Sequence, residues 1–333
     1  MRRTAILLAT STALALAGVA AQPLAPPQPL QVNVFPGGSN WPIWVAAERG
    51  FFAANGVAVK ITSTPNSVEQ LTGLIAGKFD VAMTAVDNLV AYREGQGEAK
   101  VEGPDLFAFM GGNNGFLSLV TLPDIKRFDD LRGRTLSVDA LTTGFAFVLL
   151  EMLERNGLAL GRDYQLQSAG GTLQRFDALI QGKHAGTLLS TPFDVQAQAR
   201  GYVRLAGATE VLGRYQGTLG GARKAWAEHN RDALVGYIRG YVSGVRWLYD
   251  PKNREEALAI FVKNQPNATP QAASSAYSVL LDPTNGIARD AAIELDGLRT
   301  ALALRSKYGV PQKALADPMK YYDPTYYDAA LRP

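Results

Sequence analysis

Short apolar runs alternate with amphipathic segments over much of the chain, and this alternation predicts strands separated by helices. Pro42 suits the first turn of a helix that ends at Gly50, and Ser67 can cap a helix that ends near Ala76. A further helix is expected to start at Asp87. Strands are expected between these helices, at residues 30–35, 57–64 and 80–85. Such alternation favours a mostly parallel α/β sheet with ligand sites at the carboxyl ends of the strands.

The same pattern recurs further along the chain. Strands are expected at residues 134–140, 164–169 and 185–190, each followed by a helix. The segment "LIAGKFDVAMTAVD" begins at Leu74, and the similar "LIQGKHAGTLLSTP" begins at Leu179, 105 positions later. Each indicates a helix end, a Gly-Lys turn, a buried strand and a new helix. The repetition predicts two similar α/β lobes.

Beyond Tyr215 the apolar positions follow a helical period to about Tyr308, which predicts a helical C-terminal region. Aromatic residues form a stripe on the first of these helices. We expect Trp226 and Trp247 on this stripe to pack in the core.

The first residues have the pattern of an export signal. Arg2 and Arg3 precede a short apolar run at residues 6–16, and small residues then offer a cleavage site after Ala21. The run is shorter than the roughly 20 residues that a membrane span needs. We therefore expect a signal peptide at residues 1–21, an extended linker at residues 22–29 and a soluble periplasmic protein.

Composition excludes several kinds of chemistry. The 333 residues contain no cysteine, which rules out disulfides, thiolate nucleophiles and cysteine metal sites. His184 and His229 lie far apart in sequence, which argues against a histidine metal site or a catalytic triad. The formal net charge of +3 falls to +1 without Arg2 and Arg3, so nothing indicates nucleic-acid binding. We expect no catalytic residues, metal or cofactor, and a monomer.

An ordered set of motifs resembles a known family. "IWVAAERGFFAANGVAVKI", "LIAGKFDVAMT" and "FDDLRGRTLSVDALTTG" together resemble periplasmic binding proteins for sulfonates, nitrate, taurine and thiamine precursors. Arg134 stands where that family usually has lysine. The resemblance extends from Leu30 to about Tyr308.

The resemblance implies a type II periplasmic binding fold, in which two crossing strands join two lobes and the ligand lies between them. The lobes would comprise residues 30–112 with 217–333, and residues 113–216. The implied function is that of the solute-binding component of an ABC importer, which delivers a small organic molecule to a permease in the inner membrane. The glycines of "GGNNG", residues 111–115, suit a hinge.

The cleft walls follow from the implied topology. Trp41 is expected to present a flat aromatic face to the ligand, while Trp44 packs beneath it in the core. Asp87 either contacts the ligand or only caps a helix. The full set of residues expected to bind the ligand is Ser39, Asn40, Trp41, Thr84, Asp87, Asn88, Asn113, Asn114, Thr142, Thr143, Gly144, Gly171, Thr172, Ser190, Thr191 and Tyr215.

Several of these residues stand at helix N-termini, which favour an anion. Arg175 is the one cation that the pattern places nearby, and Trp41 and Phe145 suit an aromatic body. An organic sulfonate or carboxylate therefore fits best. A thiamine-precursor-like nitrogen heterocycle that uses Asp87 as its acceptor comes second, and nitrate comes last.

Three other classes share features of this fold. A pyrimidine-synthase-like enzyme of the thiamine pathway would need a cysteine-rich stretch, and a porphobilinogen deaminase-like enzyme would need a cysteine for its cofactor. A ligand-sensing regulator would need a DNA-binding segment where the export signal stands. The sequence therefore favours a binding protein over each of them.

Overall fold

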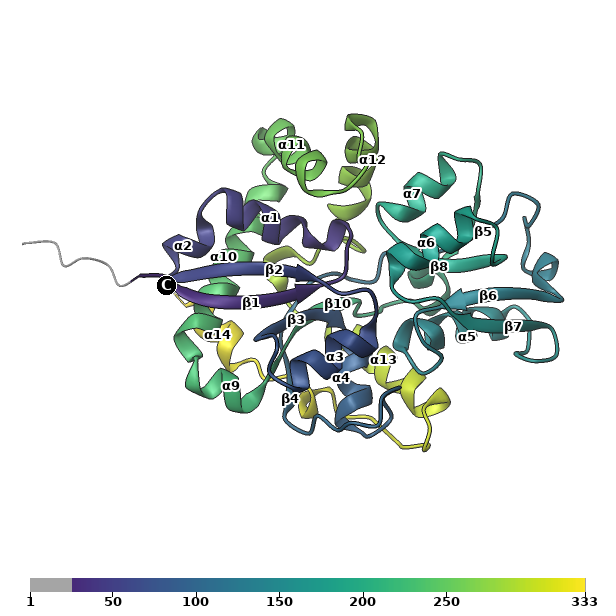
Figure 1. Cartoon of the computed structure of the whole chain (residues 1–333), viewed down its shortest axis with the longest axis horizontal. Helices are drawn as coiled ribbons and strands as arrows, with labels where there is room; N and C mark the ends of the chain where they lie inside the picture. Colours follow the sequence, from purple (N-terminus) through teal and green to yellow (C-terminus); the bar gives the residue numbers. More distant parts are fainter. Residues whose placement is uncertain (1–25, 333) are drawn as a thin grey trace, which may run out of the picture.

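Two five-stranded sheets organise the chain, and helices flank each of them (Figure 1). The computed structural model describes residues 26–332. The predicted export signal, residues 1–21, lies outside the described residues. Gln28 and Pro29, which the prediction assigned to a linker at residues 22–29, already belong to the first strand, where the Gln28 backbone N–H bonds the Gly56 carbonyl at 2.8 Å.

The first sheet has the strand order β2–β1–β3–β10–β4. Its strands are β1 (Gln28–Val34), β2 (Val57–Ser63), β3 (Val81–Ala85), β4 (Leu106–Gly111) and β10 (Thr218–Arg223). β1 pairs in parallel with β2 and β3, whereas β10 runs antiparallel to β3 and β4. The sheet is therefore mixed, with its parallel part on one side of β10.

The second sheet repeats this arrangement in the order β7–β6–β8–β5–β9. Its strands are β5 (Leu117–Thr121), β6 (Arg134–Val138), β7 (Tyr164–Ser168), β8 (Gly186–Ser190) and β9 (Val203–Gly207). β6 is parallel to β7 and β8, and β5 is antiparallel to β8 and β9. β3 and β8, the strands of the repeated segment, occupy equivalent places. The expected two-lobed periplasmic binding fold is confirmed.

Helices connect the strands and complete both lobes. Those before β10 are α1 (Trp41–Glu48), α2 (Phe51–Ala54), α3 (Ser67–Ile75), α4 (Val86–Arg93), α5 (Gly144–Arg155), α6 (Thr172–Ile180), α7 (Phe193–Gln198) and α8 (Ala208–Leu212). Those after it are α9 (Lys224–His229), α10 (Arg231–Tyr249), α11 (Arg254–Asn264), α12 (Pro270–Leu280), α13 (Leu295–Tyr308) and α14 (Thr325–Leu331). Short 3-10 turns lie at Gly38–Asn40 (η1), Phe128–Leu131, Pro251–Asn253, Arg289–Ala291 and Pro318–Lys320.

The chain crosses between the sheets twice, after β4 and before β10. We infer that one lobe boundary lies near Gly112 and the other near Gln216. The first lobe then contains β1–β4, β10 and the C-terminal helices, and the second contains β5–β9.

The expectation that the chain is wholly helical after Tyr215 is wrong, because β10 intervenes. The hydrophobic pattern does not predict this strand, because two of its central residues are glycines. A Cβ at Gly220 would lie 2.6 Å from the Phe109 ring, and one at Gly221 would lie 2.7 Å from Leu89. Close packing against β4 and α4 therefore requires glycine where a strand usually carries apolar side chains.

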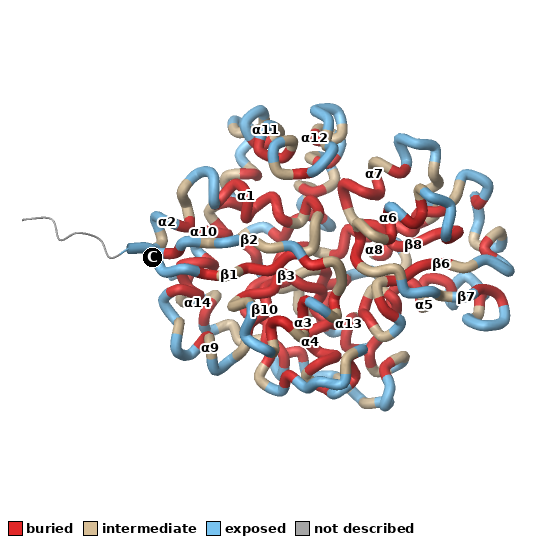
Figure 2. The backbone as a smooth tube through the Cα atoms, in the orientation of Figure 1, coloured by how far each residue is buried: buried red, intermediate tan, exposed pale blue. Residues whose placement is uncertain are grey.

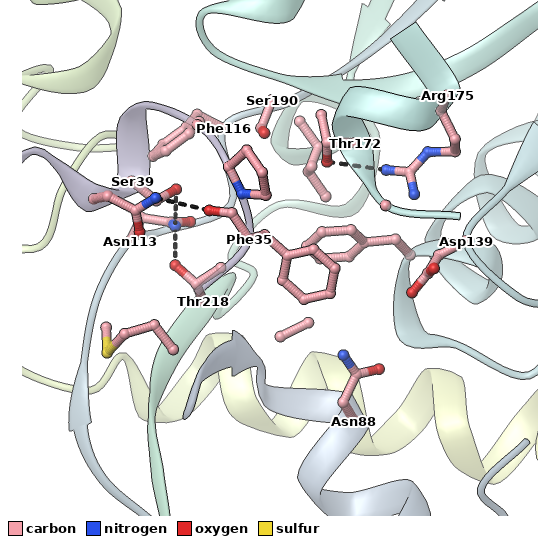
Figure 3. A pocket seen from close by; sticks show the side chains of 18 of the residues that line it. Phe35, Ser39, Asn88, Asn113, Phe116, Asp139, Thr172, Arg175, Ser190 and Thr218 are labelled. Atoms are coloured by element: carbon pink, nitrogen blue, oxygen red, sulfur yellow. Dashed lines mark hydrogen bonds between the residues drawn. The ribbon is translucent and has the colours of Figure 1, made fainter. Parts of the chain in front are cut away.

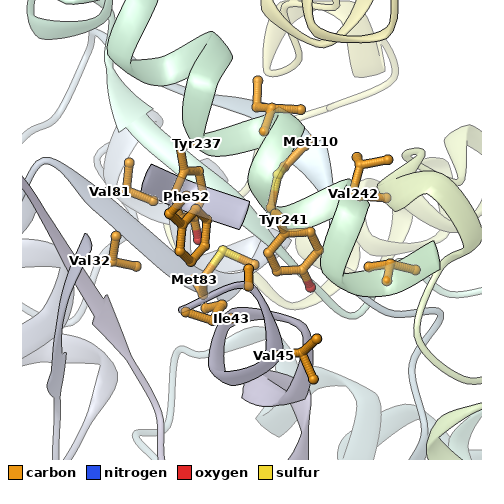
Figure 4. Packing of buried hydrophobic residues seen from close by; sticks show 14 of the residues in the cluster. Val32, Ile43, Val45, Phe52, Val81, Met83, Met110, Tyr237, Tyr241 and Val242 are labelled. Atoms are coloured by element: carbon orange, nitrogen blue, oxygen red, sulfur yellow. The ribbon is translucent and has the colours of Figure 1, made fainter. Parts of the chain in front are cut away.

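The first lobe is built around α10, which packs on α1, α2 and α14. Tyr237 of α10 stacks on Phe52 with ring centroids 5.4 Å apart, beside Val32 of β1 and Val81 of β3 (Figure 4). Figure 2 shows that buried residues run through both lobes and the region between them, so the lobes are in contact. In the described part of the chain, no helix combines the length and apolar character that crossing a membrane requires.

Candidate ligand-binding site

A cavity lies between the two sheets, at the carboxyl ends of β1, β3, β6 and β8. It encloses about 780 Å³, including the part that is open to solvent. β10 and β5 run antiparallel to their neighbours, so their first residues reach the same edges: Thr218 pairs with Ala85, and Leu117 with Ser190. The residues that line the cavity are Phe35, Pro36, Gly37, Ser39, Asn40, Met83, Ala85, Asn88, Asn113, Phe116, Leu117, Asp139, Thr143, Phe145, Gly171, Thr172, Arg175, Ser190 and Thr218.

Aromatic and aliphatic side chains provide most of one wall. Phe35 directly follows β1, Phe116 stands in the first crossing between the lobes, and Phe145 lies in the first turn of α5. Figure 3 shows Phe35 near the middle of the cavity and Phe116 at its side. Flat rings at these places suit an apolar or aromatic body.

Asn113 organises the polar end of the cavity next to the crossing strands. Its Nδ2 donates to Thr218 Oγ1 and, at 3.4 Å, to Ser39 Oγ (Figure 3). Its Oδ1 accepts the Gly115 N–H at 3.0 Å, so the side chain braces the turn of the crossing itself. Gly217 packs so tightly here that a Cβ would lie 2.1 Å from Asn113 Oδ1. This end of the cavity is therefore fixed by hydrogen bonds between side chains.

The second lobe presents the N-termini of α5 and α6. Thr143 is the N-cap residue of α5, Gly171 is that of α6, and neither helix has a side-chain cap. Thr143 Oγ1 instead donates to the Ala140 carbonyl at 2.9 Å. Amide N–H groups at the start of a helix, together with the helix dipole, favour a negative charge.

Arg175 is a buried cation in this wall, with 2% of its surface exposed. Its terminal nitrogens donate only to neutral oxygens: the Gly170 carbonyl at 2.9 Å, the Leu188 carbonyl at 3.1 Å and Thr172 Oγ1 at 3.2 Å. Its Nε is buried without a partner in the described structure. Burial lowers the pKa of the Arg175 guanidinium, and the negative charge of Asp139 acts in the opposite direction. Arg175 is a strong candidate for contact with an anion.

Asp139 lies close to Arg175 in the same wall (Figure 3). It follows β6, and its Oδ2 accepts the backbone N–H of Ser67 at 3.0 Å. Ser67 is the first residue of α3 in the other lobe. The Asp139 Oδ1 atom is buried without a partner in the described part of the chain. The cavity thus contains both a positive and a negative group with unused hydrogen-bonding capacity.

The structure brings many of the predicted residues together at the cavity. Those that line it are Ser39, Asn40, Asn88, Asn113, Thr143, Gly171, Thr172 and Ser190. All of them stand at a strand end, a helix start or a crossing, which is where the sequence pattern predicted them. Phe145 and Arg175, expected to contribute the apolar face and the charge, also line the cavity.

The expectation for Trp41 is corrected by the structure. Trp41 is fully buried in the core of the first lobe, where its Nε1 donates to the Ala257 carbonyl at 3.1 Å and its ring lies 4.7 Å from that of Phe261. Trp41 starts α1 directly after the 3-10 turn at Gly38–Asn40, and α1 packs against α10 and α11. The indole therefore faces these helices rather than the ligand. Trp44 belongs to the same core, as expected.

Asp87 likewise neither lines the cavity nor caps a helix. The N-cap residue of α4 is Ala85, and Asp87 is buried in an ion pair with Arg305 of α13. Arg305 Nε donates to Asp87 Oδ1 at 2.7 Å, and its Nη2 donates to Oδ2 and, at 2.6 Å, to the Thr142 carbonyl. The carboxylate is satisfied by an arginine more than 200 positions away, a contact that no local sequence pattern indicates.

The other predicted residues outside the cavity lie in structural contacts, although the Tyr215 hydroxyl is buried without a hydrogen-bond partner in the described structure. Thr84 accepts from Asn88, Asn114 donates to the Thr284 carbonyl, and Thr142 donates to Glu98. Gly144 packs so closely against α4 that a Cβ would lie 2.3 Å from that of Asp87. The Thr191 carbonyl accepts the Gly38 N–H at 3.1 Å, and Tyr215 is buried beside the crossing.

Sequence reasoning missed several residues of the wall. Asp139 directly follows β6 and lies near the end of the strand predicted at residues 134–140, so the rule that ligands bind at strand ends could have indicated it. Phe35 and Pro36 follow β1 in the same way. Met83 lies near the end of the strand predicted at residues 80–85. Phe116, Leu117 and Thr218 carry no such signal, because they line the cavity only through the crossings and the antiparallel strands β5 and β10.

Among the described residues, no group of three or more histidine, cysteine, aspartate or glutamate side chains is arranged to hold a metal ion. The charged groups of the cavity are Asp139 and Arg175. Their chemistry suits hydrogen bonding to an organic molecule.

Comparisons with known proteins agree with this geometry. A family model described as "NMT1/THI5 like" matches residues 39–254. No curated protein matches the sequence significantly.

Solved structures of low sequence identity share the fold. The ligand-binding component of an ABC-type import system from Staphylococcus aureus, with zinc bound, is 12% identical, with a TM-score of 0.74 over 92% of this chain and 100% of that one. The alkanesulfonate-binding protein from Xanthomonas axonopodis pv. citri, bound to MOPS, is 14% identical, with a TM-score of 0.71 over 90% and 100%. A desulfurization enzyme is 13% identical, with a TM-score of 0.62 over 91% and 99%.

Proposed function

The chain belongs to the NMT1/THI5-like family, and we propose that it is the solute-binding component of an ABC importer. In this role it captures a small organic molecule between its lobes in the periplasm and delivers it to a permease in the inner membrane. The two structural neighbours described as binding proteins support this role, since one belongs to an import system and the other binds alkanesulfonates.

The observation that carries the proposal is Arg175. A guanidinium that is almost fully buried, and whose hydrogen bonds go only to neutral oxygens, is costly unless a negative charge comes to it. Arg175 lines the same cavity as the uncapped N-termini of α5 and α6. An anionic group of the ligand would satisfy all three features at once.

The apolar wall defines the rest of the ligand. Phe35, Phe116 and Phe145 offer aromatic faces, which suit a carboxylate or sulfonate with an aromatic or extended apolar body. Nitrate would leave this surface without a contact. The heterocycle alternative loses the acceptor that the sequence suggested for it, because Arg305 occupies both oxygens of Asp87.

Binding is favoured over catalysis by the residues of the cavity. The same fold occurs in a desulfurization enzyme, so the fold alone decides nothing. Among the described residues that line the cavity, Ser39 and Ser190 are potential nucleophiles, but no histidine stands beside them to act as a base. The side chains can hold and orient a molecule without offering a nucleophile–base pair.

A thermal-shift screen tests the proposal. The panel contains aromatic and aliphatic sulfonates, aromatic carboxylates, pyrimidines and nitrate. An acid present at 100 times its dissociation constant should stabilise the protein by about 2.7 kcal/mol. Arg175→Gln should weaken binding of that acid by roughly 10- to 100-fold, the worth of a hydrogen bond to a charged group.

The matched control is Arg134→Gln, because Arg134 is an exposed arginine of the same lobe, on β6, and its partner is Asp124. It should bind the acid like the unaltered protein. Circular dichroism of both variants establishes that they fold. A protein that responds to nitrate or pyrimidines but to no organic acid would contradict the proposed ligand class.

A further inference from the structure

Asp139 occupies an unusual position, because its two carboxylate oxygens have different surroundings. Oδ2 accepts the Ser67 N–H of the first lobe at 3.0 Å, whereas Oδ1 is buried and has no partner within the described structure. Both oxygens of an ionised carboxylate can only accept hydrogen bonds. A buried oxygen of this kind costs free energy until a donor reaches it.

No residue in the described part of the chain supplies that donor. Arg175, a cation of the same wall, directs its terminal nitrogens to Gly170, Thr172 and Leu188, and its Nε has no partner among the described residues. Asn113 bonds Ser39 and Thr218 at the opposite side of the view (Figure 3), and Asn88 Nδ2 donates to Thr84 Oγ1. Asp139 lines the cavity, so a ligand is placed to provide the missing donor.

We propose that Asp139 selects ligands that carry an N–H or ammonium donor in addition to their acid group, and that it links recognition of this donor to closure of the lobes. This inference rests on the proposed function. The preferred ligand is then bifunctional: its acid lies toward Arg175 and the helix N-termini, its donor bonds Asp139 Oδ1, and its apolar body lies against the phenylalanines. Aromatic aminocarboxylates and aminosulfonates belong to this class.

The link to closure follows from the second oxygen. Asp139 belongs to the second lobe, whereas Ser67 is the first residue of α3 in the first lobe. Two further backbone hydrogen bonds cross between the lobes nearby, from Gly171 N–H to the Pro65 carbonyl at 2.7 Å and from Gly38 N–H to the Thr191 carbonyl at 3.1 Å. A donor on Oδ1 holds the carboxylate in the orientation in which Oδ2 meets Ser67. Ligand binding to Asp139 would thus stabilise a hydrogen bond that holds the two lobes together.

Paired probes that differ only in the donor test the selectivity by isothermal titration calorimetry. One pair is para-(aminomethyl)benzoate and para-toluate, and the other is para-(aminomethyl)benzenesulfonate and para-toluenesulfonate. In each pair the amino compound should bind at least about tenfold more tightly. Asp139→Asn can present an N–H to the ligand in place of an acceptor. It should weaken the amino compound of each pair by roughly 10- to 100-fold relative to its partner without a donor.

Ser67→Pro tests the link to closure. Proline is tolerated at the first position of a helix, and the extended backbone of Asn66 (φ −159°, ψ 166°) suits a residue before proline. The substitution removes the N–H that Asp139 accepts but leaves the carboxylate in place. We expect both members of a pair to bind more weakly, with the preference for the amino compound retained, and the ligand-induced compaction measured by small-angle scattering to be reduced.

The outcomes separate this inference from the proposed function. If no acid of either pair binds, the proposed binding of organic acids fails. If acids bind but the paired compounds are equal, or the compounds without a donor bind more tightly, selection by Asp139 is overturned while the proposed function stands. Because the paired comparison uses the unaltered protein, it decides the question even if a variant does not fold. Unchanged compaction in a folded Ser67→Pro variant would overturn the link to closure.

Discussion

Ser39 and Trp41 are two positions apart, yet one lines the cavity and the other lies in the core. Between them, Asn40 ends the 3-10 turn, and its Nδ2 donates to the Phe35 carbonyl at 2.7 Å. This bond closes the turn and fixes the direction in which α1 begins. The turn itself therefore belongs to the binding wall, whereas the first side chain of α1 packs among the helices of the first lobe.

Trp41→Ala should destabilise the fold. Truncation of a buried tryptophan costs roughly 3–5 kcal/mol, and this one also loses its bond to Ala257. Ser39→Ala is the control in the same stretch, and we expect it to change the free energy of unfolding by less than about 1 kcal/mol. Urea denaturation measures both. A Trp41→Ala variant with unchanged stability would show that the indole is not part of the core.

Asp87 and Arg305 form a second residue-scale test, because both are almost fully buried. Arg305→Met leaves the Asp87 carboxylate without its cation, which should cost roughly 3–5 kcal/mol. The double variant Asp87→Leu with Arg305→Met removes the unpaired charge and should recover most of that loss. Chemical denaturation of the single and double variants checks this. Equal destabilisation in both would contradict the assigned pairing.

At the scale of elements, α13 links the lobes. It packs on α4 of the first lobe and on α5 of the second. Beyond Arg305, Lys307 Nζ and the Tyr308 hydroxyl of α13 each donate to Glu151 Oε2 of α5 at 2.8 Å. The contact between these two helices is thus charged as well as apolar, which makes it sensitive to acid.

Glu151 provides a test by pH. Although burial raises its pKa, hydrogen bonds from Lys307, Arg155 and Tyr308 outweigh this and lower it from 4.5 to about 2. A lowered pKa in the folded state contributes stability above pH 4.5 that is lost as the pH falls toward 2. The contribution is at most about 3 kcal/mol. Glu151→Gln should flatten the fall in the free energy of unfolding across this range, and an unchanged slope would contradict the assignment.

The sequence pattern predicted the strands and helices that recur in both lobes, but it missed the strand β10, which follows the second crossing between the lobes. The strand ends and helix starts of β3 with α4 and β8 with α7 were predicted because each buried run is followed by a helix signal. β10 was missed because its glycines hide a strand. The same limit applies to the site: Asn88, Thr143 and Ser190 could be placed from strand ends, whereas the roles of Trp41 and Asp87 depend on distant helices.

At the scale of the whole molecule, the lobes meet around the cavity through bonds that involve few side chains. Two of these bonds are entirely backbone to backbone, between Gly171 and Pro65 and between Gly38 and Thr191. A Cβ at Gly38 would lie 2.9 Å from the Thr191 carbonyl, and one at Gly171 would lie equally close to that of Pro65. Both glycines allow the lobes to approach at the cavity.

We therefore predict that a bound ligand favours this closed arrangement over more open ones. Small-angle scattering should give a smaller radius of gyration with a saturating acid than without it. Gly38→Val should reduce the compaction, because its side chain would stand against Thr191 and Leu280. Ala53→Val, at an exposed position of α2 in the first lobe, controls for the introduction of a valine. Identical scattering with and without ligand would contradict closure.

The most direct measurement is a crystal structure of the protein with the acid that binds most tightly in the thermal-shift screen. We predict the acid group within hydrogen-bonding distance of Arg175 or of the first N–H groups of α5 and α6, with the apolar body between Phe35 and Phe116. An acid bound outside this cavity, or one within it whose charge points away from both Arg175 and the helix N-termini, would contradict the assignment of the site.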